Sequence, residues 1–276
     1  MYRSAVLSAF AIIILFASGC SGYEKLLKSD DFDTKQIKAQ EYYNEGDYAK
    51  ALPLLDQLLA VKSGTAQEEE IRYFIAYCHY GQSEFLLSAS LFKSFWLSFP
   101  RSYRAEECLY MSAYCLYKSS PGYELDQTET EKALESFQFF VDTYDKSERI
   151  QQCNDLMDEM RLKMEKKMYE SANLYYNTEN YQAAAITYEN MLKEFPETKE
   201  AEDVGVLIIR SYFNYAVQSI ICKKEERYNK AIASFNQFKE KYPASENMNE
   251  AESLYKRSVS LKEKALNEKE NYNCNE

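Results

Sequence analysis

Apolar and small residues recur along most of the chain at spacings of three and four positions, which is the period of an amphipathic α-helix. Aligned on one small residue, a similar string returns five times, as QIKAQEYY, YFIAYCHY, YMSAYCLY, YESANLYY and IIRSYFNY. The aligned small residues are Ala39, Ala76, Ala113, Ala172 and Ser211. The tyrosines that close the strings are Tyr43, Tyr80, Tyr117, Tyr176 and Tyr215. The pattern predicts five copies of one helix, each with a small residue where a partner helix approaches.

A second apolar pattern follows each string and predicts a second helix in the repeated unit. It is clearest in YQAAAITYENMLKEFP, residues 181–196, where a proline ends the helix because its ring cannot continue the hydrogen-bond ladder. A helix–turn–helix unit with this pattern is typical of the tetratricopeptide repeat. Residues 246–270 are amphipathic and predict a last helix that covers the end of the stack. The sequence therefore predicts an all-α fold, a tetratricopeptide-repeat α-solenoid of five helical hairpins plus a C-terminal capping helix.

The repeats are longer than the usual length of about 34 residues. The small residues of the second helices are Ala51, Ser88, Ala133, Ala184 and Ala231, with spacings of 37, 45, 51 and 47 residues. Residues 119–130 contain Pro-Gly and other turn formers, so we expect a loop there. Residues 147–167 continue helical spacing, so we expect them to lengthen one helix to roughly 30 residues.

The N-terminus has the pattern of an export signal. Arg3 precedes an apolar run over residues 5–16, which is shorter than the roughly 20 residues that span a bilayer. Ala-Ser-Gly then leads into Cys20, an arrangement that resembles a bacterial lipobox and predicts lipidation of Cys20; an ordinary signal peptide with an incidental cysteine is the alternative. The expected organisation is a signal peptide over 1–19, a lipid-anchored tether over 20–33, repeats 1–3 over 34–145, and repeats 4–5 with the capping helix over 146–276.

Composition and charge exclude several classes of function. The chain has 33 Lys and Arg against 44 Asp and Glu, a net charge of −11 that disfavours nucleic acid and electrostatic binding to anionic lipids. The single histidine, His79, removes most metal and acid–base chemistry, and we expect it to be structural. We expect no catalytic residues, no metal and no cofactor. The other cysteines, at 78, 108, 115, 153, 222 and 274, are interpreted mainly as small buried residues, with disulfides left open.

Tyrosines repeat along one face of the first helices and form a candidate binding surface. Tyr73, Tyr77 and Tyr80 are spaced i, i+4 and i+7, and the next unit repeats this spacing with Tyr110, Tyr114 and Tyr117. With Tyr43 they predict a concave groove for extended or aromatic-rich peptides, because tyrosine offers a broad apolar face and a hydroxyl that can stay in water. The alternative for each single tyrosine is packing against the neighbouring hairpin. Tyr176, Tyr212 and Tyr215 continue the pattern.

The order of these segments resembles the BamD family of outer-membrane lipoproteins. The lipobox-like Cys20 is followed by GYEKLLKS and then by YYNEGDYAKALPLL in the first repeat. Residues 160–198, MRLKMEKKMYESANLYYNTENYQAAAITYENMLKEFPET, resemble the central stretch of that family. Asp145 stands where the family has a proline at the end of the third repeat.

The resemblance implies an outer-membrane scaffold that faces the periplasm and acts by binding. Its N-terminal repeats would recognise unfolded outer-membrane proteins, and its C-terminal repeats, with Tyr176, Tyr212 and Tyr215, would contact the POTRA domains of a BamA-like barrel insertase. Two alternatives remain open at this point: a general periplasmic interaction lipoprotein, such as a coordinator of envelope division, and a glycan-capturing lipoprotein. One tryptophan in 276 residues weakens the glycan alternative.

Overall fold

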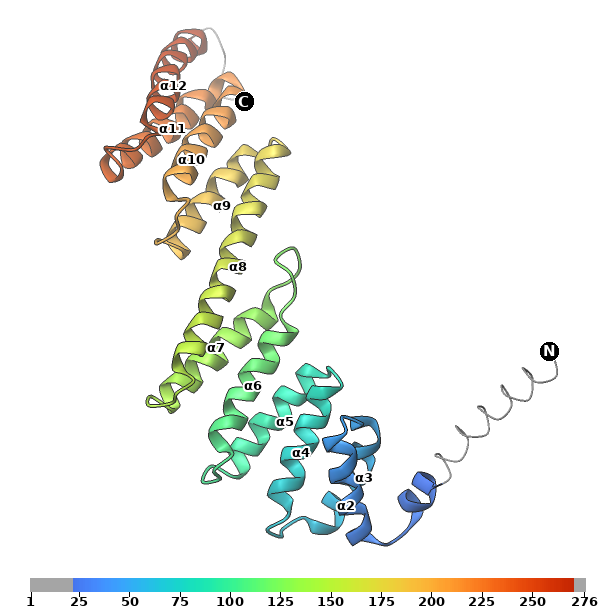
Figure 1. Ribbon diagram of the computed structural model, residues 1–276. Helices are drawn as coiled ribbons and strands as arrows, with labels where there is room; N and C mark the ends of the chain where they lie inside the picture. The colour runs from blue at the N-terminus through green and yellow to red at the C-terminus, as the bar shows by residue number, and fades with distance from the viewer. Residues whose placement is uncertain (1–21, 271–276) are drawn as a thin grey trace, which may run out of the picture. The chain divides into compact units, whose positions relative to one another are not determined.

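The computed structural model describes residues 22–270. The expected signal peptide, Cys20 and Cys274 lie outside these residues. Figure 1 shows helices joined by short connections throughout the described chain. Their bounds are α2 Phe32–Asn44, α3 Tyr48–Lys62, α4 Glu68–Gly81, α5 Phe85–Ser98, α6 Ala105–Ser119, α7 Thr128–Thr143, α8 Ile150–Asn177, α9 Tyr181–Glu194, α10 Ala201–Val217, α11 Ile221–Lys241 and α12 Met248–Lys269. Within residues 22–270 no helix is long and apolar enough to cross a membrane.

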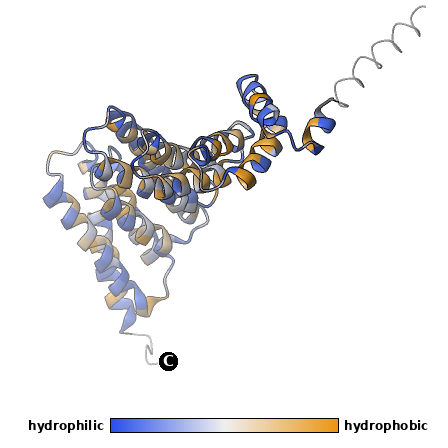
Figure 2. Ribbon diagram, turned by 90° about the horizontal axis from the view of Figure 1, so that it is seen from below, coloured by the Kyte–Doolittle hydropathy of each residue, from blue (hydrophilic) through white to orange (hydrophobic). Residues whose placement is uncertain are grey.

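The helices pair into the predicted hairpins, α2–α3, α4–α5, α6–α7 and α10–α11, followed by α12. Helices α8 and α9 pair through contacts of Tyr188 with Tyr169 and Asn173. The all-α repeat fold is thereby confirmed. The small residues that define the repeats have no exposed surface in either helix of any hairpin. They are Ala39, Ala76, Ala113, Ala172 and Ser211 in the first helices and Ala51, Ser88, Ala133, Ala184 and Ala231 in the second helices. Figure 2 shows apolar and polar residues sharing single helices, as an amphipathic pattern requires.

The two longer insertions take the predicted forms. The chain between α6 and α7 is a loop, and α8 is a continuous helix of 28 residues. The second helices α5, α7, α9 and α11 all end on an aromatic residue with φ between −121° and −128°. Helix α7 shares this geometry although Asp145 replaces the proline, so the proline is not needed to end the helix.

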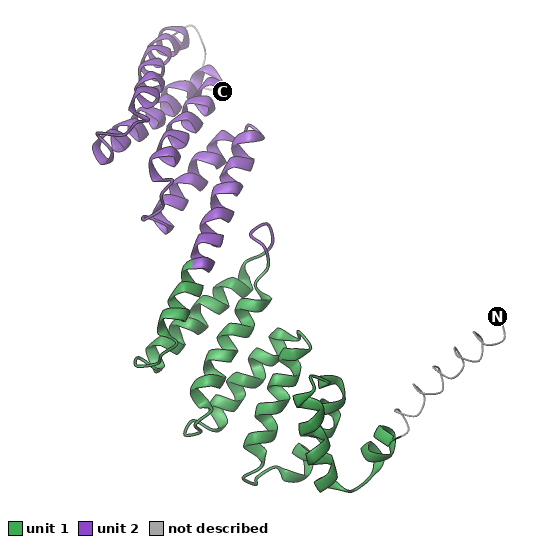
Figure 3. Ribbon diagram, in the orientation of Figure 1, with its two compact units in different colours: residues 1–121, 126–158 green, residues 122–125, 159–276 purple. Residues whose placement is uncertain are grey.

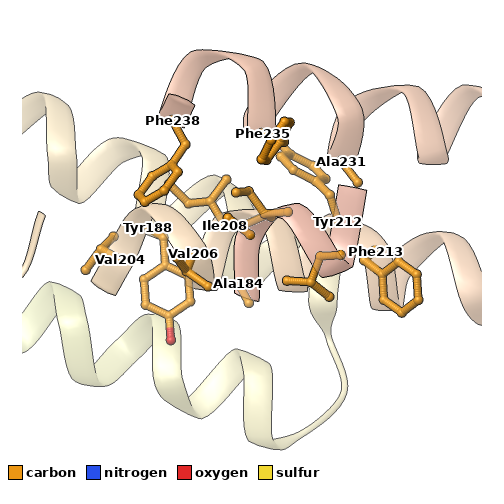
Figure 4. Close-up of a cluster of buried hydrophobic side chains, with 14 of the residues drawn as sticks. Ala184, Tyr188, Val204, Val206, Ile208, Tyr212, Phe213, Ala231, Phe235 and Phe238 are labelled. Carbon is orange, nitrogen blue, oxygen red and sulfur yellow. The ribbon is translucent and has the colours of Figure 1, made fainter. Parts of the chain in front are cut away.

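The described chain divides into two compact units (Figure 3). Unit 1 comprises the described part of residues 1–121 with 126–158, and unit 2 comprises 122–125 with the described part of 159–276. The core of the first hairpins in unit 1 contains Leu54, Leu58 and Ile75. The core of unit 2 joins α9, α10 and α11, and Figure 4 shows Tyr188 with the aromatic residues Phe235 and Phe238 of α11 in this cluster.

The segment that we expected to act as a tether makes ordered contacts with the first hairpin. Residues 22–28 are helical, and Tyr23, Leu26 and Leu27 pack against the core of α2 and α3. The Tyr23 hydroxyl donates to the Lys50 carbonyl oxygen at 3.0 Å. The ammonium group of Lys35, which is almost fully buried, donates to the Leu27 carbonyl oxygen at 3.2 Å and to Gln57 Oε1 at 2.5 Å. The chain is therefore anchored to the fold from residue 23 onward.

A hydroxyl–carboxylate clamp joins successive hairpins at three equivalent places. Ser102 before α6 donates to Glu69 at the start of α4, with Oγ and Oε1 2.5 Å apart. Ser147 donates to Glu106 in the same way at 2.5 Å, and Thr198 donates to Glu165. Each hydroxyl also accepts the backbone N–H two residues later, which orders the turn into the next helix. The sequence analysis missed this clamp, although each Ser or Thr lies 14 residues after the small residue of the preceding helix.

Four described cysteines are small buried thiols as expected, and a fifth takes the alternative that the sequence left open. Cys78, Cys108, Cys115 and Cys153 are free and fully buried. Burial raises the pKa of the Cys78 thiol to about 12 and the pKa values of Cys115 and Cys153 to about 11, so they remain protonated at neutral pH. Cys222, in contrast, is disulfide-bonded and is not one of the small buried thiols.

The clamp predicts a stability effect that is separate from packing. Ser102→Ala removes the hydrogen bond to Glu69 and the bond to the backbone N–H of Arg104, so the free energy of unfolding should fall by about 1–2 kcal/mol. Urea unfolding followed by circular dichroism measures the change. Ser94→Ala, at an exposed position of α5, is the matched control and should change stability by less than about 0.5 kcal/mol. Equal effects of the two substitutions would contradict the role of the clamp.

Candidate functional site

All seven tyrosines predicted for the N-terminal surface lie in one continuous row of ring contacts in unit 1. Phe74 joins Tyr43 of α2 to Tyr73 of α4, and Tyr80 joins α4 to Tyr114 of α6. The distances between ring centroids along the row are Tyr43–Phe74 4.7 Å, Phe74–Tyr73 5.6 Å, Tyr73–Tyr77 4.8 Å, Tyr77–Tyr80 6.3 Å, Tyr80–Tyr114 6.4 Å, Tyr114–Tyr110 5.8 Å and Tyr114–Tyr117 5.8 Å. We call these seven tyrosines together with Phe74 the tyrosine row.

Glu107 of α6 holds the centre of the tyrosine row. Its carboxylate accepts hydrogen bonds from the Tyr73 hydroxyl at 3.1 Å and from the Tyr77 hydroxyl at 2.5 Å. Burial and then the Glu107 charge raise the pKa of Tyr73 to about 12, and burial with the Glu107 hydrogen bond raises the pKa of Tyr77 further. Both phenols therefore stay protonated and act as fixed donors, which makes this part of the row rigid.

Two arginines cover part of the row. Arg104 lies with its Cζ 4.5 Å from the centroid of the Tyr73 ring, and Arg149 lies at the same distance over Tyr110. Tyr110 is only 4% exposed, so its ring is a packing element and cannot meet a ligand without rearrangement. The rings of Tyr43, Tyr77, Tyr80, Tyr114 and Tyr117 are half-buried and keep some exposed surface.

A cavity of about 550 Å³ opens between α2 and α4 at the Tyr43 end of the row. Its volume falls within the range of roughly 300–1,000 Å³ that is usual for ligand pockets. The apolar residues that line it are Ile37, Ala39, Tyr43, Leu55, Leu58, Ile71 and Phe74. We call it the α2–α4 cavity.

Among the residues that line the α2–α4 cavity, only Tyr43 was predicted from the sequence to be a binding residue. Ile37 and Phe74 were missed, although both occupy the same place in the repeat, two positions before the small residues Ala39 and Ala76. Ile37 is 61% exposed, which is unusual for a large aliphatic side chain. An apolar residue at an outward position of the helical pattern was the signal that could have indicated the cavity.

The three C-terminal candidates lie in unit 2 and differ in accessibility. Tyr212 is 7% exposed, and burial raises its pKa. Tyr176 accepts a hydrogen bond from Asn214 Nδ2 at 3.1 Å, and Arg227 lies 3.9 Å from the centroid of the Tyr215 ring. Tyr215 also lines a pocket of about 430 Å³ with Tyr181 and Ile186. Tyr215 is therefore the candidate with the best-defined surface.

His79 packs near the turn between α4 and α5 and contacts a carboxylate. Its side chain is largely buried, and Nδ1 is 2.5 Å from Glu84 Oε2 near the turn between α4 and α5. Within the described residues, no group of three or more His, Cys, Asp or Glu side chains is arranged to hold a metal ion.

The buried tyrosines predict a loss of stability at alkaline pH. Burial raises the pKa of Tyr110 from its ordinary value of 10.0 to about 12. Because the folded-state pKa is the higher one, the stabilisation is complete below about pH 10 and is lost as pH rises towards 12. Tyr110→Phe removes the ionising hydroxyl. Between pH 10 and 12 the free energy of unfolding of this variant should therefore fall less steeply with pH than that of the unmodified protein, with slopes that differ by up to about 1.4 kcal/mol per pH unit.

Urea denaturation at pH 8, 10, 11 and 12 measures this difference. Tyr103→Phe is the matched control for loss of a hydroxyl, because the Tyr103 side chain is 82% exposed and its replacement should change the free energy of unfolding by less than about 0.5 kcal/mol. Parallel profiles for Tyr110→Phe and the unmodified protein would show that ionisation of Tyr110 does not limit alkaline stability.

Solved structures of similar proteins include two repeat domains. The tetratricopeptide-repeat domain of P58(IPK) shares 18% identity with a TM-score of 0.39, covering 88% of this chain and 68% of that chain. The TPR2AB domain of yeast Sti1 in its pHSP90 complex shares 12% identity with a TM-score of 0.40, covering 83% of this chain and 98% of that chain. A tetratricopeptide-repeat family model also matches residues 218–245, which include α11.

Two curated relatives have a common name. The outer membrane protein assembly factor BamD of Pasteurella multocida (strain Pm70) is 22% identical over 234 residues, covering 79% of this chain and 85% of that protein. The putative outer membrane protein assembly factor BamD of Aquifex aeolicus (strain VF5) is 22% identical over 208 residues, covering 75% of this chain and 68% of that protein. The family model YfiO, described as an outer membrane lipoprotein, matches residues 33–223. Since this match spans well over half of the sequence, the chain belongs to the YfiO family of outer membrane lipoproteins.

Proposed function

We propose that this protein is an outer-membrane lipoprotein scaffold that promotes assembly and insertion of β-barrel proteins. In this proposal unit 1 binds unfolded outer-membrane proteins, and unit 2 binds a BamA-like insertase through its POTRA domains. Family membership and the names of the two curated relatives support the general role. The observation that carries the binding role is the α2–α4 cavity at the end of the tyrosine row, because it offers apolar and aromatic surface to a polypeptide.

The chemistry of the tyrosine row suits a client that has not yet folded. Such a client exposes its backbone and its apolar side chains along an extended chain. Tyrosine rings present apolar area at a small cost in side-chain entropy, and the Glu107 hydrogen bonds hold Tyr73 and Tyr77 in place before binding. A surface of this kind favours moderate, reversible affinity, which a scaffold needs if it is to release its client.

The proposed insertase surface lies around the pocket that contains Tyr215. Ile186 and Tyr215 line this pocket, and both Val217, the last residue of α10, and Ile220, the N-cap of α11, expose large apolar area. Ile220 is 70% exposed, which is the pattern of an interaction surface rather than of a core residue. Tyr212 belongs to the core of unit 2 and is not among the residues that line this pocket.

The proposed location is the outer membrane, with the fold in the periplasm and acyl chains on Cys20 as the anchor. The chain carries a net charge of −11, so its membrane attachment cannot rely on attraction to anionic lipids. Acyl chains contribute about 0.8 kcal/mol per buried CH₂ and need no basic residues.

The environment of the single tryptophan weakens the glycan-binding alternative. A glycan-binding lipoprotein would need an exposed aromatic platform. Trp96 is half-buried, with its ring centroid 5.5 Å from that of Phe139, and its Nε1 donates to the Tyr144 hydroxyl at 3.0 Å. The indole of Trp96 therefore packs and hydrogen-bonds within unit 1. The alternative of a general periplasmic interaction lipoprotein differs in its partners, so it is separated by the experiment below.

Co-purification tests the proposed partner surface. We expect a tagged chain extracted in mild detergent to bring down a BamA-like barrel protein, and we expect Ile220→Asp to reduce the yield at least fivefold, because a charge would replace an apolar contact. Asp at position 220 precedes the first turn of α11, where an acidic cap is favourable, so the fold should persist. Leu162→Asp, at an exposed position of α8, is the control and should retain the partner. Recovery of envelope-division or glycan-uptake proteins instead would contradict the proposal.

The anchor is tested separately. Cys20→Ser removes the thiol that would be acylated, so we expect the chain to move from the membrane fraction to the soluble periplasmic fraction. Cell fractionation with immunoblotting measures the distribution, and Ser21→Ala serves as the neighbouring control. A Cys20→Ser protein that stays in the outer-membrane fraction, in cells that lack the insertase partner, would refute lipid anchoring at this residue.

A further inference from the structure

Helix α11 begins earlier in its repeat than the second helices of other hairpins. Helices α3, α5 and α9 each begin three residues before their small repeat residue, whereas α11 begins at Ile221, ten residues before Ala231. The additional residues 221–227 form about two helical turns. We call these residues the α11 extension. It contains Cys222 and directly follows Ile220, the exposed residue of the proposed insertase surface.

Packing alone holds the α11 extension weakly. Five of its seven residues are charged, and none of the seven is fully buried. Arg227 at its end contacts the Tyr215 ring and donates to Ser219 Oγ at 2.5 Å. A helical segment with so little buried apolar surface is prone to open locally. A covalent bond to a neighbouring segment would oppose this opening.

Elimination leaves few partners for the half-buried Cys222. This residue is disulfide-bonded, and the four other described cysteines are free. Of the seven cysteines in the sequence, Cys20 and Cys274, which lie outside the described residues, are then the candidates for its partner. The thiol of Cys20 would be consumed in the proposed lipid anchor. Cys274 is therefore the candidate that remains.

The end of α12 lies within reach of Cys222. Helices α11 and α12 lie side by side in unit 2 (Figure 1), and Lys269 Nζ, in the last residue of α12, is 3.3 Å from Glu225 Oε2. Glu225 follows Cys222 by three residues, which is about 4.5 Å along a helix axis. Cys274 follows Lys269 by five residues, and an extended chain of that length spans up to about 17 Å.

We propose that Cys222 is bonded to Cys274, and that this disulfide holds the α11 extension and Ile220 in the conformation that receives the insertase. The second part rests on the proposed function and assigns the disulfide a positioning role. A surface that is ordered before binding loses less conformational entropy when the partner binds. The disulfide therefore raises the affinity for the insertase without touching it.

Formation of the bond requires an oxidant, for which we propose the disulfide of an exported thiol oxidase. The Cys222 thiolate attacks that disulfide and forms a mixed disulfide, which the Cys274 thiolate then resolves. The two cysteine thiols lose two protons and two electrons, and the oxidase leaves as a dithiol that has gained them. Disulfides persist outside the cytosol, where the predicted export signal would send the chain.

Peptide mapping tests the pairing. Trypsin cleaves after Lys and Arg, so it releases Cys222 in residues 211–223 and Cys274 in residues 270–276. The full chain is extracted in mild detergent, its free thiols are blocked with iodoacetamide, and the unreduced digest is analysed by mass spectrometry. We expect the two peptides to be joined and to separate on reduction. A blocked Cys222 thiol, or a bond from Cys222 to another peptide, would overturn the pairing.

Stability and hydrogen exchange test what the bond does. Cys274→Ser should lower the thermal unfolding midpoint by at least about 5 °C and should speed amide exchange in residues 221–227 at least tenfold, while exchange in α5 of unit 1 stays unchanged. Asn273→Ser is the neighbouring control and should behave as the unmodified protein. Cys222→Ser combined with Cys274→Ser should have no greater effect than either alone, because one substitution already removes the bond. Additive effects would overturn the inference.

Recovery of the insertase separates this inference from the proposed function. We expect Cys274→Ser to recover at least threefold less insertase than the unmodified chain or Asn273→Ser. Equal recovery would overturn the positioning role and would leave the proposed function standing. If the unmodified chain recovers no insertase, the proposed function and the positioning role both fail, and the peptide map still decides the pairing.

Discussion

The close approach of two helices at a small residue is the constraint on which the rest of this structure depends. At ten repeat positions a fully buried Ala or Ser lets the helices of a hairpin come together. Side chains three or four positions away then point to the sides of the contact, where rings fill the remaining space. Tyr73 and Tyr80 flank Ala76 in this way, and Tyr110 and Tyr117 flank Ala113. The same packing that forms a hairpin therefore also sets the register of the tyrosine row.

Contacts between hairpins tolerate insertions because they use a fixed place in each repeat. The repeat spacing varies from 37 to 51 residues, yet Ser102, Ser147 and Thr198 each donate to a glutamate on the first helix of the preceding hairpin. This glutamate lies in the first turn of α4 and of α6, and in the middle of the lengthened helix α8. In unit 1 the residue two positions after each clamp serine is an arginine, and it stacks on a tyrosine of that same preceding helix. The insertions lie outside the segment from the second-helix small residue to the clamp, so they lengthen loops or helices without changing the interface.

The features that were predicted correctly are those that depend only on the spacing of residues within one helix. The hairpins, the length of α8 and the burial of the small residues follow from the spacing of side chains along one helix. The burial of Tyr110 does not, because it depends on Arg149 from the turn that precedes the next hairpin. The α2–α4 cavity likewise needs Ile37 and Phe74 from two hairpins, and the packing of residues 22–28 rests on three apolar side chains that show no sustained period. Sequence patterns specify which residues share a face, but they do not specify which faces are covered by residues from other repeats.

Partial burial of the tyrosine row suits the binding role that we propose for it. A ring held on one side by Glu107 or by a neighbouring ring has already lost its rotational freedom, so a ligand that meets the other side does not have to order it. Rigid rings alone discriminate poorly, because any apolar side chain gains from contact with them.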